Sequence, residues 1–417
     1  MENLNILEQY NYWNKKPIDG GFSRVLYLNR LMKYTGNRLI KVLIGQRRSG
    51  KSYVLRQLIT KLISQKVNPR NIFYLNKESV DFDYIENYKQ LKKLIDLYLL
   101  KIKPRGKVYI LLDEIQEVSG WEKLVNSLSQ DHTKNFEVFI TGSNSKMLSG
   151  ELATLLSGRY VAFEIFPFSY SEFVGYKNLP KEKKTYLEYL NTGGLPELMN
   201  LEHEEARLHY VNSLVSTILY KDVVTRYSVK DAYLLERLFK YAAANVGFLV
   251  SLNNIVNFLK TQKINVKYET VANYLGYLED ACLLHRAERM EIKTKELLAG
   301  NRKYYLNDMA YKNYLISSFD KGFGQLLENS IYLHYRATGY NVNVGMLRNA
   351  EIDFCVHKSN DFKYVQVSYL LSDHKVIERE FGNFRQIKDN YEKTVVTMDD
   401  LSLGNKEGIK HLLAWEL

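Results

Sequence analysis

A glycine-rich run between an apolar segment and a helical pattern is the strongest chemical signal in the sequence. Residues 45–52 read Gly-Gln-Arg-Arg-Ser-Gly-Lys-Ser and match the phosphate-binding pattern G-x-x-x-x-G-K-[ST] at every fixed position. The glycines let successive backbone N–H groups point at one phosphate, and the start of the following helix adds a positive dipole. Lys51 would then neutralise the β- and γ-phosphates, and Ser52 would offer its hydroxyl to Mg²⁺. The predicted nucleotide contacts are Gly45, Gln46, Arg47, Arg48, Ser49, Gly50, Lys51, Ser52 and Tyr53.

Two adjacent carboxylates follow an apolar run further along the chain. The run Val108–Leu112 ends in Asp113 and Glu114, and a buried parallel strand would place both acids beside the phosphate loop. Asp113 could hold hydrated Mg²⁺ there, while Glu114 could polarise the attacking water. A surface turn is the simpler interpretation of the acids alone, but the phosphate loop reverses that preference. Because adjacent acids favour hydrolysis over transfer to a small acceptor, we predict a P-loop ATPase that uses ATP and Mg²⁺.

Two further segments concern the base and the attacking water. Asn76-Lys77-Glu78-Ser79 resembles a guanine-specifying motif only in its first two residues, so adenine is favoured. The fourth apolar run ends in Thr141 and is followed by Asn144, which would lie near Asp113 if the strands take the additional-strand ATPase order. Either Thr141 or Asn144 could orient the water or sense the γ-phosphate. Either could instead cap the next helix.

The elements that must position these residues alternate along the first part of the chain. Short apolar runs and helical patterns follow one another, which is typical of an α/β unit with a parallel sheet. Residues 84–102 repeat apolar side chains at helical spacing and predict a crossover helix. The expected strands are Ile40–Ile44, Ile72–Leu75, Val108–Leu112, Glu137–Thr141 and Val161–Phe166.

Composition and charge narrow the class of protein. The chain has 417 residues, enough for about three domains, and is 46% hydrophobic and 25% charged. Fifty-eight Lys and Arg against 47 Asp and Glu give a net charge of +11, which favours a polyanion such as nucleic acid as a partner, and the winged-helix pattern described below favours DNA. No apolar run is long enough for a membrane helix and no leader pattern opens the chain, so we expect a cytoplasmic protein without a membrane partner. Two cysteines, Cys282 and Cys355, cannot build a disulfide framework.

Six short segments are scattered along the chain: GQRRSGKS, LLDEIQ, TGSNSKMLS, LSGRY, PFSYSEF and GGLPE. Together they resemble the prokaryotic AAA-type ATPases, relatives of the AAA+ proteins, that carry a C-terminal domain of unknown function. The resemblance implies the roles given above for the phosphate loop and the paired acids, with Asn144 as a sensor. Arg159 falls on the family's Gly-Arg pair, which implies a phosphate contact within the chain or across a subunit interface of a homo-oligomer. A surface salt bridge is the plainer alternative for Arg159.

The middle of the chain combines two short helices with a hairpin. Ser251 is typical of an N-cap for a helix over 252–260, a second helix follows over 268–278, and β-like runs occur at 283–288 and 303–306. Helix, turn, helix and hairpin in this order are typical of a winged helix. The side chains expected near nucleic acid are then Lys267, Thr270, Asn273, Tyr274, Lys293, Lys295, Arg302 and Lys303. A packing module without nucleic-acid contact is the alternative.

The last part of the chain predicts a helix followed by strands at 341–344, 352–356, 363–367 and 394–398. The resemblance implies a domain similar to PD-(D/E)xK nucleases here. Its expected metal ligands are Glu328, Asp353 and Gln366. Ser368 stands where the lysine of that pattern belongs, so metal affinity and water activation should both fall, unless Lys363 or Lys375 substitutes. A degenerate nucleic-acid-binding or structural domain is therefore favoured over an active nuclease.

These patterns predict three regions. A P-loop NTPase domain with a parallel sheet is expected over 1–185, a helical lid and winged-helix region over 186–320, and a small restriction-endonuclease-like α/β domain over 321–417. The leading hypothesis is an ATP-hydrolysing switch or remodeller that acts on nucleic acid. The alternatives are an ATP-gated signalling or interaction protein with negligible turnover, and a nuclease licensed by ATP.

Overall fold

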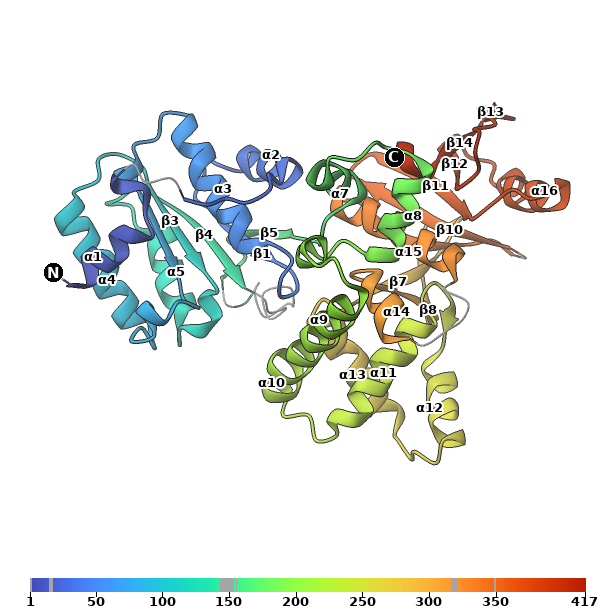
Figure 1. Cartoon of the computed structure of the whole chain (residues 1–417), viewed down its shortest axis with the longest axis horizontal. Coiled ribbons are helices and arrows are strands. Elements are labelled where there is room, and N and C mark those ends of the chain that lie inside the picture. Colours follow the sequence, from blue (N-terminus) through green and yellow to red (C-terminus); the bar gives the residue numbers. More distant parts are fainter. Residues whose placement is uncertain (1, 15–17, 143–153, 155, 317–321, 349) are drawn as a thin grey trace. The chain divides into compact units, whose positions relative to one another are not determined.

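The computed structural model describes the whole chain except residues 1, 15–17, 143–153, 155, 317–321 and 349. The chain folds into two compact units, residues 1–165 and 166–417 (Figure 1). The sequence predicted three regions, with boundaries near 185 and 320. The second and third of these regions contribute strands to one continuous sheet and belong to the second unit.

A five-stranded parallel sheet forms the centre of the N-terminal unit. Its strands are β1 (Ile40–Ile44), β2 (Ile72–Asn76), β3 (Val108–Asp113), β4 (Phe136–Gly142) and β5 (Tyr160–Glu164). Each predicted strand is confirmed, with ends that differ by at most two residues. The order β2-β3-β4-β1-β5 places β1 next to β4 and puts β3 on the other side of β4. Because all five strands are parallel, their carboxyl ends meet at one edge of the sheet.

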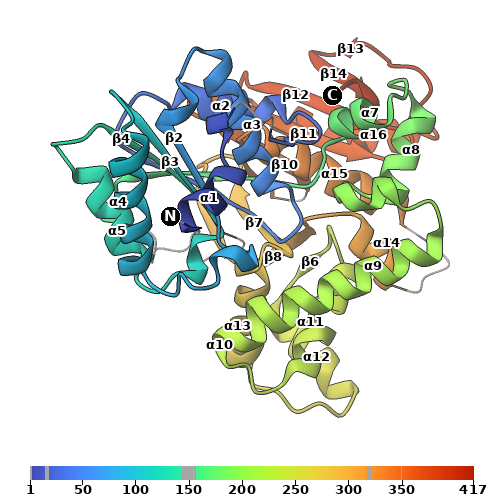
Figure 2. The same ribbon diagram turned by 60° about the vertical axis from the view of Figure 1, so that its left-hand side comes forward.

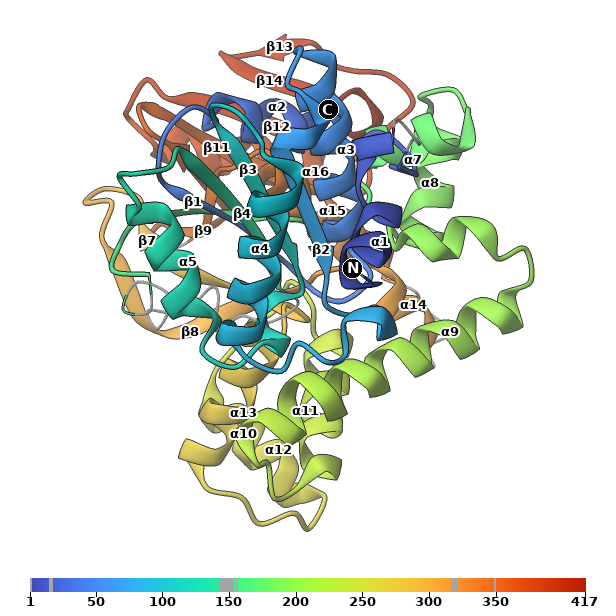
Figure 3. The same cartoon turned by 90° about the vertical axis from the view of Figure 1, so that its left-hand side faces the viewer.

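Helices cover both faces of this sheet. They are α1 (Glu2–Gln9), α2 (Val25–Lys33), α3 (Lys51–Ser64), α4 (Tyr88–Ile102) and α5 (Trp121–Gln130), with 3₁₀ turns at Tyr12–Asn14, Pro69–Asn71, Val80–Phe82 and Ile115–Glu117. Alternate residues of β1 serve the two cores: Val42 packs with α1, α4 and α5, whereas Leu43 packs with α2 and α3. α4 and α5 lie side by side on one face (Figure 3). Burial on both faces explains why most residues of the strands are apolar.

The C-terminal unit is built on a nine-stranded mixed sheet. Its strands are β6 (Leu249–Val250), β7 (Leu284–Glu291), β8 (Leu297–Leu306), β9 (Asn341–Met346), β10 (Glu351–Lys358), β11 (Asp361–Ser368), β12 (Glu392–Thr397), β13 (Asn405–Lys406) and β14 (Ile409–Leu413). They follow the order β13-β14-β12-β11-β10-β9-β7-β8-β6. The four strands predicted beyond residue 340 correspond to β9 to β12.

The helices of this unit are α7 (Tyr170–Lys177), α8 (Lys183–Thr192), α9 (Glu204–Thr217), α10 (Thr225–Tyr227), α11 (Ala232–Ala244), α12 (Leu252–Thr261), α13 (Tyr268–Asp280), α14 (Ala310–Leu315), α15 (Phe323–Ala337) and α16 (His374–Gly382). A π-helical segment, Ile218–Val224, joins α9 to α10, and 3₁₀ turns occur at Pro196–Asn200, Asn383–Gln386 and Ala414–Glu416. Helices α11, α12 and α13 gather in one group (Figure 2).

The predicted succession of helix, turn, helix and hairpin is present in α12, α13, β7 and β8. Ser251 caps α12, because its Oγ accepts a hydrogen bond from the Asn254 N–H at 3.0 Å. The hairpin does not project from the fold as a separate wing, because its β7 strand pairs with a further strand. Residues Arg289–Glu291 of β7 pair in parallel with Val344–Met346 of β9. The hairpin is therefore part of the same sheet as the C-terminal strands.

The GGLPE segment ties the start of the C-terminal unit together. The carbonyl oxygen of Gly194 accepts a hydrogen bond from the Phe168 N–H at 2.7 Å, and the Gly194 N–H donates to Asp308 Oδ2 at 2.7 Å. A Cβ on Gly194 would collide with the backbone carbonyl oxygen of Phe168. Two segments of the family pattern, PFSYSEF and GGLPE, thus meet through a backbone contact that only glycine permits.

Gly194→Ala is expected to lower the free energy of unfolding by about 3 kcal/mol, the upper part of the range for an overpacked core. Gly276→Ala is the matched control: this glycine lies within α13, a Cβ there meets no atom within 4 Å, and alanine favours helix. Urea denaturation of both variants measures the difference. Equal stability of the two variants would contradict the proposed close approach.

Candidate nucleotide site

The loop between β1 and α3 has the backbone geometry of a phosphate cradle. Gly45 and Gly50 have φ angles of +146° and +96°, a region that favours glycine. A Cβ on Gly45 would collide with the carbonyl oxygen of Ile165. α3 begins at Lys51, so its first N–H groups have no intrahelical partners and point towards the loop. The segment singled out in the sequence therefore has the shape that anion binding requires.

The Ser49 hydroxyl adds an independent sign that an anion fits this loop. Its Oγ is buried and has no hydrogen-bond partner among the residues that the structure describes. Buried polar groups are normally paired, because an unpaired group loses its hydration without compensation. A phosphate oxygen bound in the cradle could accept the hydrogen bond that the protein leaves unmade.

Lys51 directs its ammonium group into the same loop. Its Nζ donates to the carbonyl oxygens of Gly45 at 3.0 Å and Gln46 at 2.9 Å. The same Nζ lies 3.7 Å from Glu114 Oε1, and both side chains are buried. The cation is thus held within reach of an anion in the loop.

Asp113 lies at the end of β3 and is surrounded by hydroxyl groups from three other elements. Ser52 of α3 donates to Oδ1 at 3.1 Å, Thr141 of β4 donates to the same oxygen at 2.5 Å, and Tyr74 of β2 donates to Oδ2 at 2.9 Å. Burial raises the pKa of the Asp113 carboxyl, and the adjacent Glu114 raises it further, while the three hydroxyls lower it. Oxygen ligands from Ser52 and Asp113 together match the preference of Mg²⁺.

Glu114 is oriented by two polar contacts. Its backbone has φ of +53°, and its N–H donates to Thr141 Oγ1 at 2.9 Å. The Gln116 side-chain amide donates to Glu114 Oε2 at 2.6 Å. Thr141 therefore contacts both acids. Asn144, the other predicted sensor, lies outside the described residues.

The remaining predicted contacts surround the cradle. Arg47 pairs with Glu78, with NH1 and Oε1 3.1 Å apart. Arg48 has φ of +64°, and Gln46 is buried. Tyr53 is 42% exposed and stacks against the Arg56 guanidinium, 4.2 Å from the ring centre.

Arg24 contacts the phosphate loop and was not identified from the sequence. Its guanidinium NH1 donates to the Ser49 carbonyl oxygen at 3.0 Å, and its side chain is buried. The Arg24 N–H donates to Gln57 Oε1 at 2.8 Å, which links this residue to α3. A lone arginine ahead of an amphipathic helix carries no motif, so only the folded chain shows that Arg24 supports the loop.

Arg159 lies at the opposite edge of the sheet from the phosphate loop. Its carbonyl oxygen accepts a hydrogen bond from the N–H of Ile40, the first residue of β1, whereas the loop follows the last residue, Ile44. Four residues of parallel strand span about 13 Å. The predicted phosphate contact within one chain is therefore wrong for geometric reasons. The Arg159 backbone precedes β5 and its side chain is exposed, so the contact across a subunit interface stays a prediction.

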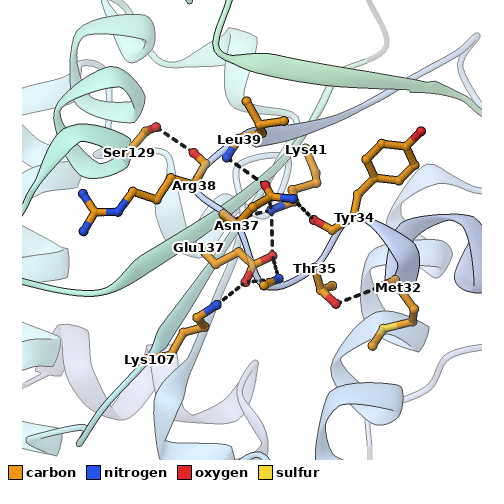
Figure 4. Close-up of polar contacts among 11 residues, drawn as sticks. Met32, Tyr34, Thr35, Asn37, Arg38, Leu39, Lys41, Lys107, Ser129 and Glu137 are labelled. Carbon is orange, nitrogen blue, oxygen red and sulfur yellow. Dashed lines mark hydrogen bonds and ion pairs between the residues drawn. The ribbon is translucent and has the colours of Figure 1, made fainter.

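A buried ion-pair network lies at this opposite edge, near the first residues of β1 and β4 (Figure 4). Lys41 Nζ lies 2.7 Å from Glu137 Oε1, and both side chains are fully buried. Lys107 Nζ lies 3.1 Å from Glu137 Oε2, and the Gly36 N–H donates to both carboxylate oxygens at 3.1 Å. Burial lowers the pKa of Lys41, and Glu137 raises it. One carboxylate thus compensates two ammonium groups and fixes the turn that leads into β1.

The second predicted site, in the C-terminal unit, contains a lysine at its centre. Lys303 Nζ lies 3.0 Å from Glu328 Oε1, 2.6 Å from Glu351 Oε1 and 3.7 Å from Asp353 Oδ1. Burial lowers the pKa of Lys303, but Glu328 and the two neighbouring carboxylates raise it above its ordinary value. Gln366, the third predicted ligand, donates to Glu380 Oε2 at 2.9 Å.

Three side chains predicted to face nucleic acid are engaged within the C-terminal unit instead. Lys303 is buried in the carboxylate cluster, and Tyr274 is buried in the core. Lys295 pairs with Asp389 at 3.0 Å and lies over the rings of Phe362, Tyr364 and Tyr391. The prediction fails at Lys295 and Lys303 because the hairpin packs on the C-terminal strands, and at Tyr274 because that face of α13 packs into the core.

The fold and the phosphate loop define the N-terminal unit as a P-loop domain of the AAA type. A family model described as an AAA domain, AAA_14, matches residues 37–174. A second model, described as a domain of unknown function, DUF8612, matches residues 183–321.

An uncharacterised protein of Haemophilus influenzae is 36% identical over 379 residues, which cover 90% of this chain and 93% of that protein. An uncharacterised protein of Methanocaldococcus jannaschii is 33% identical over 381 residues, which cover 88% of this chain and 80% of that protein. The chain belongs to the family of these two proteins. Among solved structures, a Walker-type ATPase of Pyrococcus abyssi is similar in fold. The match covers 71% of this chain and 96% of that chain, with 15% sequence identity and a TM-score of 0.46.

Within the described ranges, every helix is too short or too polar to span a membrane.

Proposed function

We propose that the protein is a Mg²⁺-dependent ATPase that acts as a switch or remodeller on nucleic acid. The observation that carries this proposal is the convergence of the loop lysine and hydroxyl with the paired acids at one edge of the parallel sheet. Lys51 and Ser52 lie at the start of α3, and the two acids lie at the end of β3 and directly after it. The two sets contact each other, with Ser52 Oγ 3.1 Å from Asp113 and Lys51 Nζ 3.7 Å from Glu114.

Each residue at this edge has its own task in the proposal. Lys51 neutralises the phosphates bound by the loop, and Ser52 and Asp113 hold Mg²⁺, which supplies further positive charge against the phosphates when bound. Glu114 accepts a proton from the attacking water. Thr141 and Gln116 hold the backbone and the carboxylate of Glu114 in place. Arg24 stabilises the loop by donating a hydrogen bond to the Ser49 carbonyl oxygen.

Calorimetry and phosphate release test the nucleotide half of the proposal. Titration of the full chain with ATP or ADP in the presence of Mg²⁺ should give binding heat, and ATP should release phosphate in the steady state. If neither nucleotide binds to the folded protein, the proposal is wrong.

The nucleic-acid half of the proposal rests on exposed lysines at the end of α12 and in the turn before α13. Residues 237–268 contain no Asp or Glu. The cations of this stretch are Arg237, Lys240, Lys260, Lys263 and Lys267. Lys240 pairs with Glu236 at 2.7 Å, whereas Lys260, Lys263 and Lys267 are exposed at the α12–α13 turn. Such a surface suits the phosphates of a nucleic acid better than any protein segment of mixed charge.

Replacement of Lys260, Lys263 and Lys267 by Gln is expected to flatten the salt dependence of DNA binding. The slope of log K against log salt should fall by about 3, roughly 0.9 for each lost phosphate contact. Fluorescence anisotropy of a labelled duplex over a series of salt concentrations measures it. The matched control replaces Lys89, Lys92 and Lys93, three exposed lysines of α4, by Gln. Equal effects of the two triple variants would mean that net charge alone drives binding.

The second candidate is a signalling or interaction protein whose partner binding is controlled by bound ATP, with negligible ATP hydrolysis. In that case ATP stays bound to the protein and phosphate release is close to zero, with or without nucleic acid. Rapid release of phosphate that is stimulated by DNA or RNA favours the remodeller.

A contact of Arg159 with the phosphates of a neighbouring subunit would require a homo-oligomer, which is part of the proposal. Analytical ultracentrifugation with ATP would reveal whether one assembles.

A further inference from the structure

The carboxylate cluster of the C-terminal unit bears on a question separate from ATP, namely whether the nuclease-like domain binds a divalent metal. The resemblance implies Glu328, Asp353 and Gln366 as ligands. The structure places the ammonium group of Lys303 among Glu328, Glu351 and Asp353 instead. Lys303 is only 5% exposed, so the cation is enclosed with the acids.

Each expected ligand already has partners in the protein. Glu328 Oε1 accepts hydrogen bonds from Lys303 at 3.0 Å and from the Tyr305 hydroxyl at 2.6 Å. Asp353 Oδ2 accepts from the Val367 N–H at 2.8 Å. Gln366 Oε1 accepts from the Asp353 N–H at 3.3 Å, so its carbonyl oxygen serves the backbone.

The same surroundings explain why a metal ion does not fit. With Lys303 in place, no group of three or more His, Cys, Asp or Glu side chains in the described part of the chain is arranged to hold one. An ammonium group has only donors and satisfies several carboxylates at once, which is what a metal ion would otherwise do here. The residues present therefore disagree with the metal that the resemblance implies.

The sheet explains how Lys303 reaches this position. Lys303 and Tyr305 are alternate residues of β8, so they project on one face of the strand. β8 pairs with β7, and β7 pairs with β9, which pairs in turn with β10, the strand of Glu351 and Asp353. The hairpin of the middle region thus places the Lys303 ammonium group among the carboxylates of the last region.

We propose that the Lys303 ammonium group takes the place of the divalent cation, so that the nuclease-like site is closed to metal and loss of this lysine exposes a latent site for Mn²⁺ or Mg²⁺. The freed ligands are the carboxylates of Glu328, Glu351 and Asp353, which are hard oxygen donors of the kind both ions prefer. The absence of a lysine at Ser368 fits the same conclusion.

Mn²⁺ binding to the nucleotide-free full chain, followed by electron paramagnetic resonance, tests the proposal without any nuclease assay. The wild type and Asp353→Asn should show the same Mn²⁺ isotherm. Lys303→Met should gain a Mn²⁺ site that Lys303→Met/Asp353→Asn lacks, and Lys303→Arg, which keeps the cation, should gain none. In thermal unfolding, Mn²⁺ should raise the midpoint of Lys303→Met but not that of the wild type.

Two results would overturn the proposal. One is a wild-type Mn²⁺ site that Asp353→Asn removes, because it would show that metal and lysine coexist. The other is a folded Lys303→Met variant that gains no Mn²⁺ site. If Lys303→Met fails to fold, the comparison of the wild type with Asp353→Asn still decides whether the site is closed.

Discussion

Glu114→Gln is expected to lower steady-state ATP hydrolysis by about 10²- to 10⁴-fold, the usual contribution of a general base. The amide keeps the size of the carboxylate but cannot take a proton from water. Because Lys51, Ser52 and Asp113 are untouched, ATP should still bind and should remain uncleaved on the protein. Phosphate release and nucleotide retention on a desalting column measure the two effects.

Two companion variants make this result specific. Glu117→Gln changes an exposed acid three residues further along the chain and should hydrolyse ATP at the wild-type rate. Lys51→Ala should lose nucleotide binding itself, because it removes the cation that the loop presents to the phosphates. Wild-type turnover by Glu114→Gln would show that another group activates the water.

Glu137→Ala is expected to lower the free energy of unfolding by about 3–5 kcal/mol, the range for breaking a buried ion pair by removal of one partner. The change leaves the fully buried Lys41 ammonium without its carboxylate and the Gly36 N–H without its acceptor. Urea denaturation followed by circular dichroism measures the loss. Removal of the ammonium as well, in Lys41→Met/Glu137→Ala, should restore part of the stability.

An exposed ion pair provides the control for this prediction. Lys92 and Asp96 are one helical turn apart on α4, with Nζ and Oδ2 2.5 Å apart and both side chains about half exposed. Asp96→Ala should cost no more than about 0.5 kcal/mol, because water screens the pair. If Glu137→Ala shifts the urea midpoint no further than Asp96→Ala does, the network of Figure 4 contributes little to stability.

The sequence predicted the N-terminal unit closely because its signals are local. The apolar runs of β1 to β5 and the glycines of the phosphate loop each depend on neighbouring residues, and their ends follow from the same patterns. The contact of Arg24 with the phosphate loop and the contacts of Lys303 with the carboxylates were missed because their partners are distant in sequence. Arg24 contacts Ser49, 25 residues on, and Lys303 contacts Glu351, 48 residues on. Neither residue type reveals such a partner.

Which strands pair with each other was likewise harder to predict than the positions of the strands in the sequence. The hairpin of β7 and β8 was predicted as the wing of a winged helix, but its pairing with β9 was not predicted. A β-pattern states that a segment is extended and half buried, and it does not name the strand beside it. The parallel contact between β7 and β9 therefore became visible only in the fold, and it decides where Lys295 and Lys303 lie.

The same contact between β7 and β9 limits how the chain can be divided. A fragment that stops before residue 321 would leave the β7 edge without its neighbour, and a fragment that starts there would do the same to β9. Unpaired strand edges recruit strands from other molecules. Either half alone should therefore tend to aggregate, and a pull exerted on α12 and α13 should travel through the backbone into the carboxyl-terminal strands rather than stop at a flexible joint.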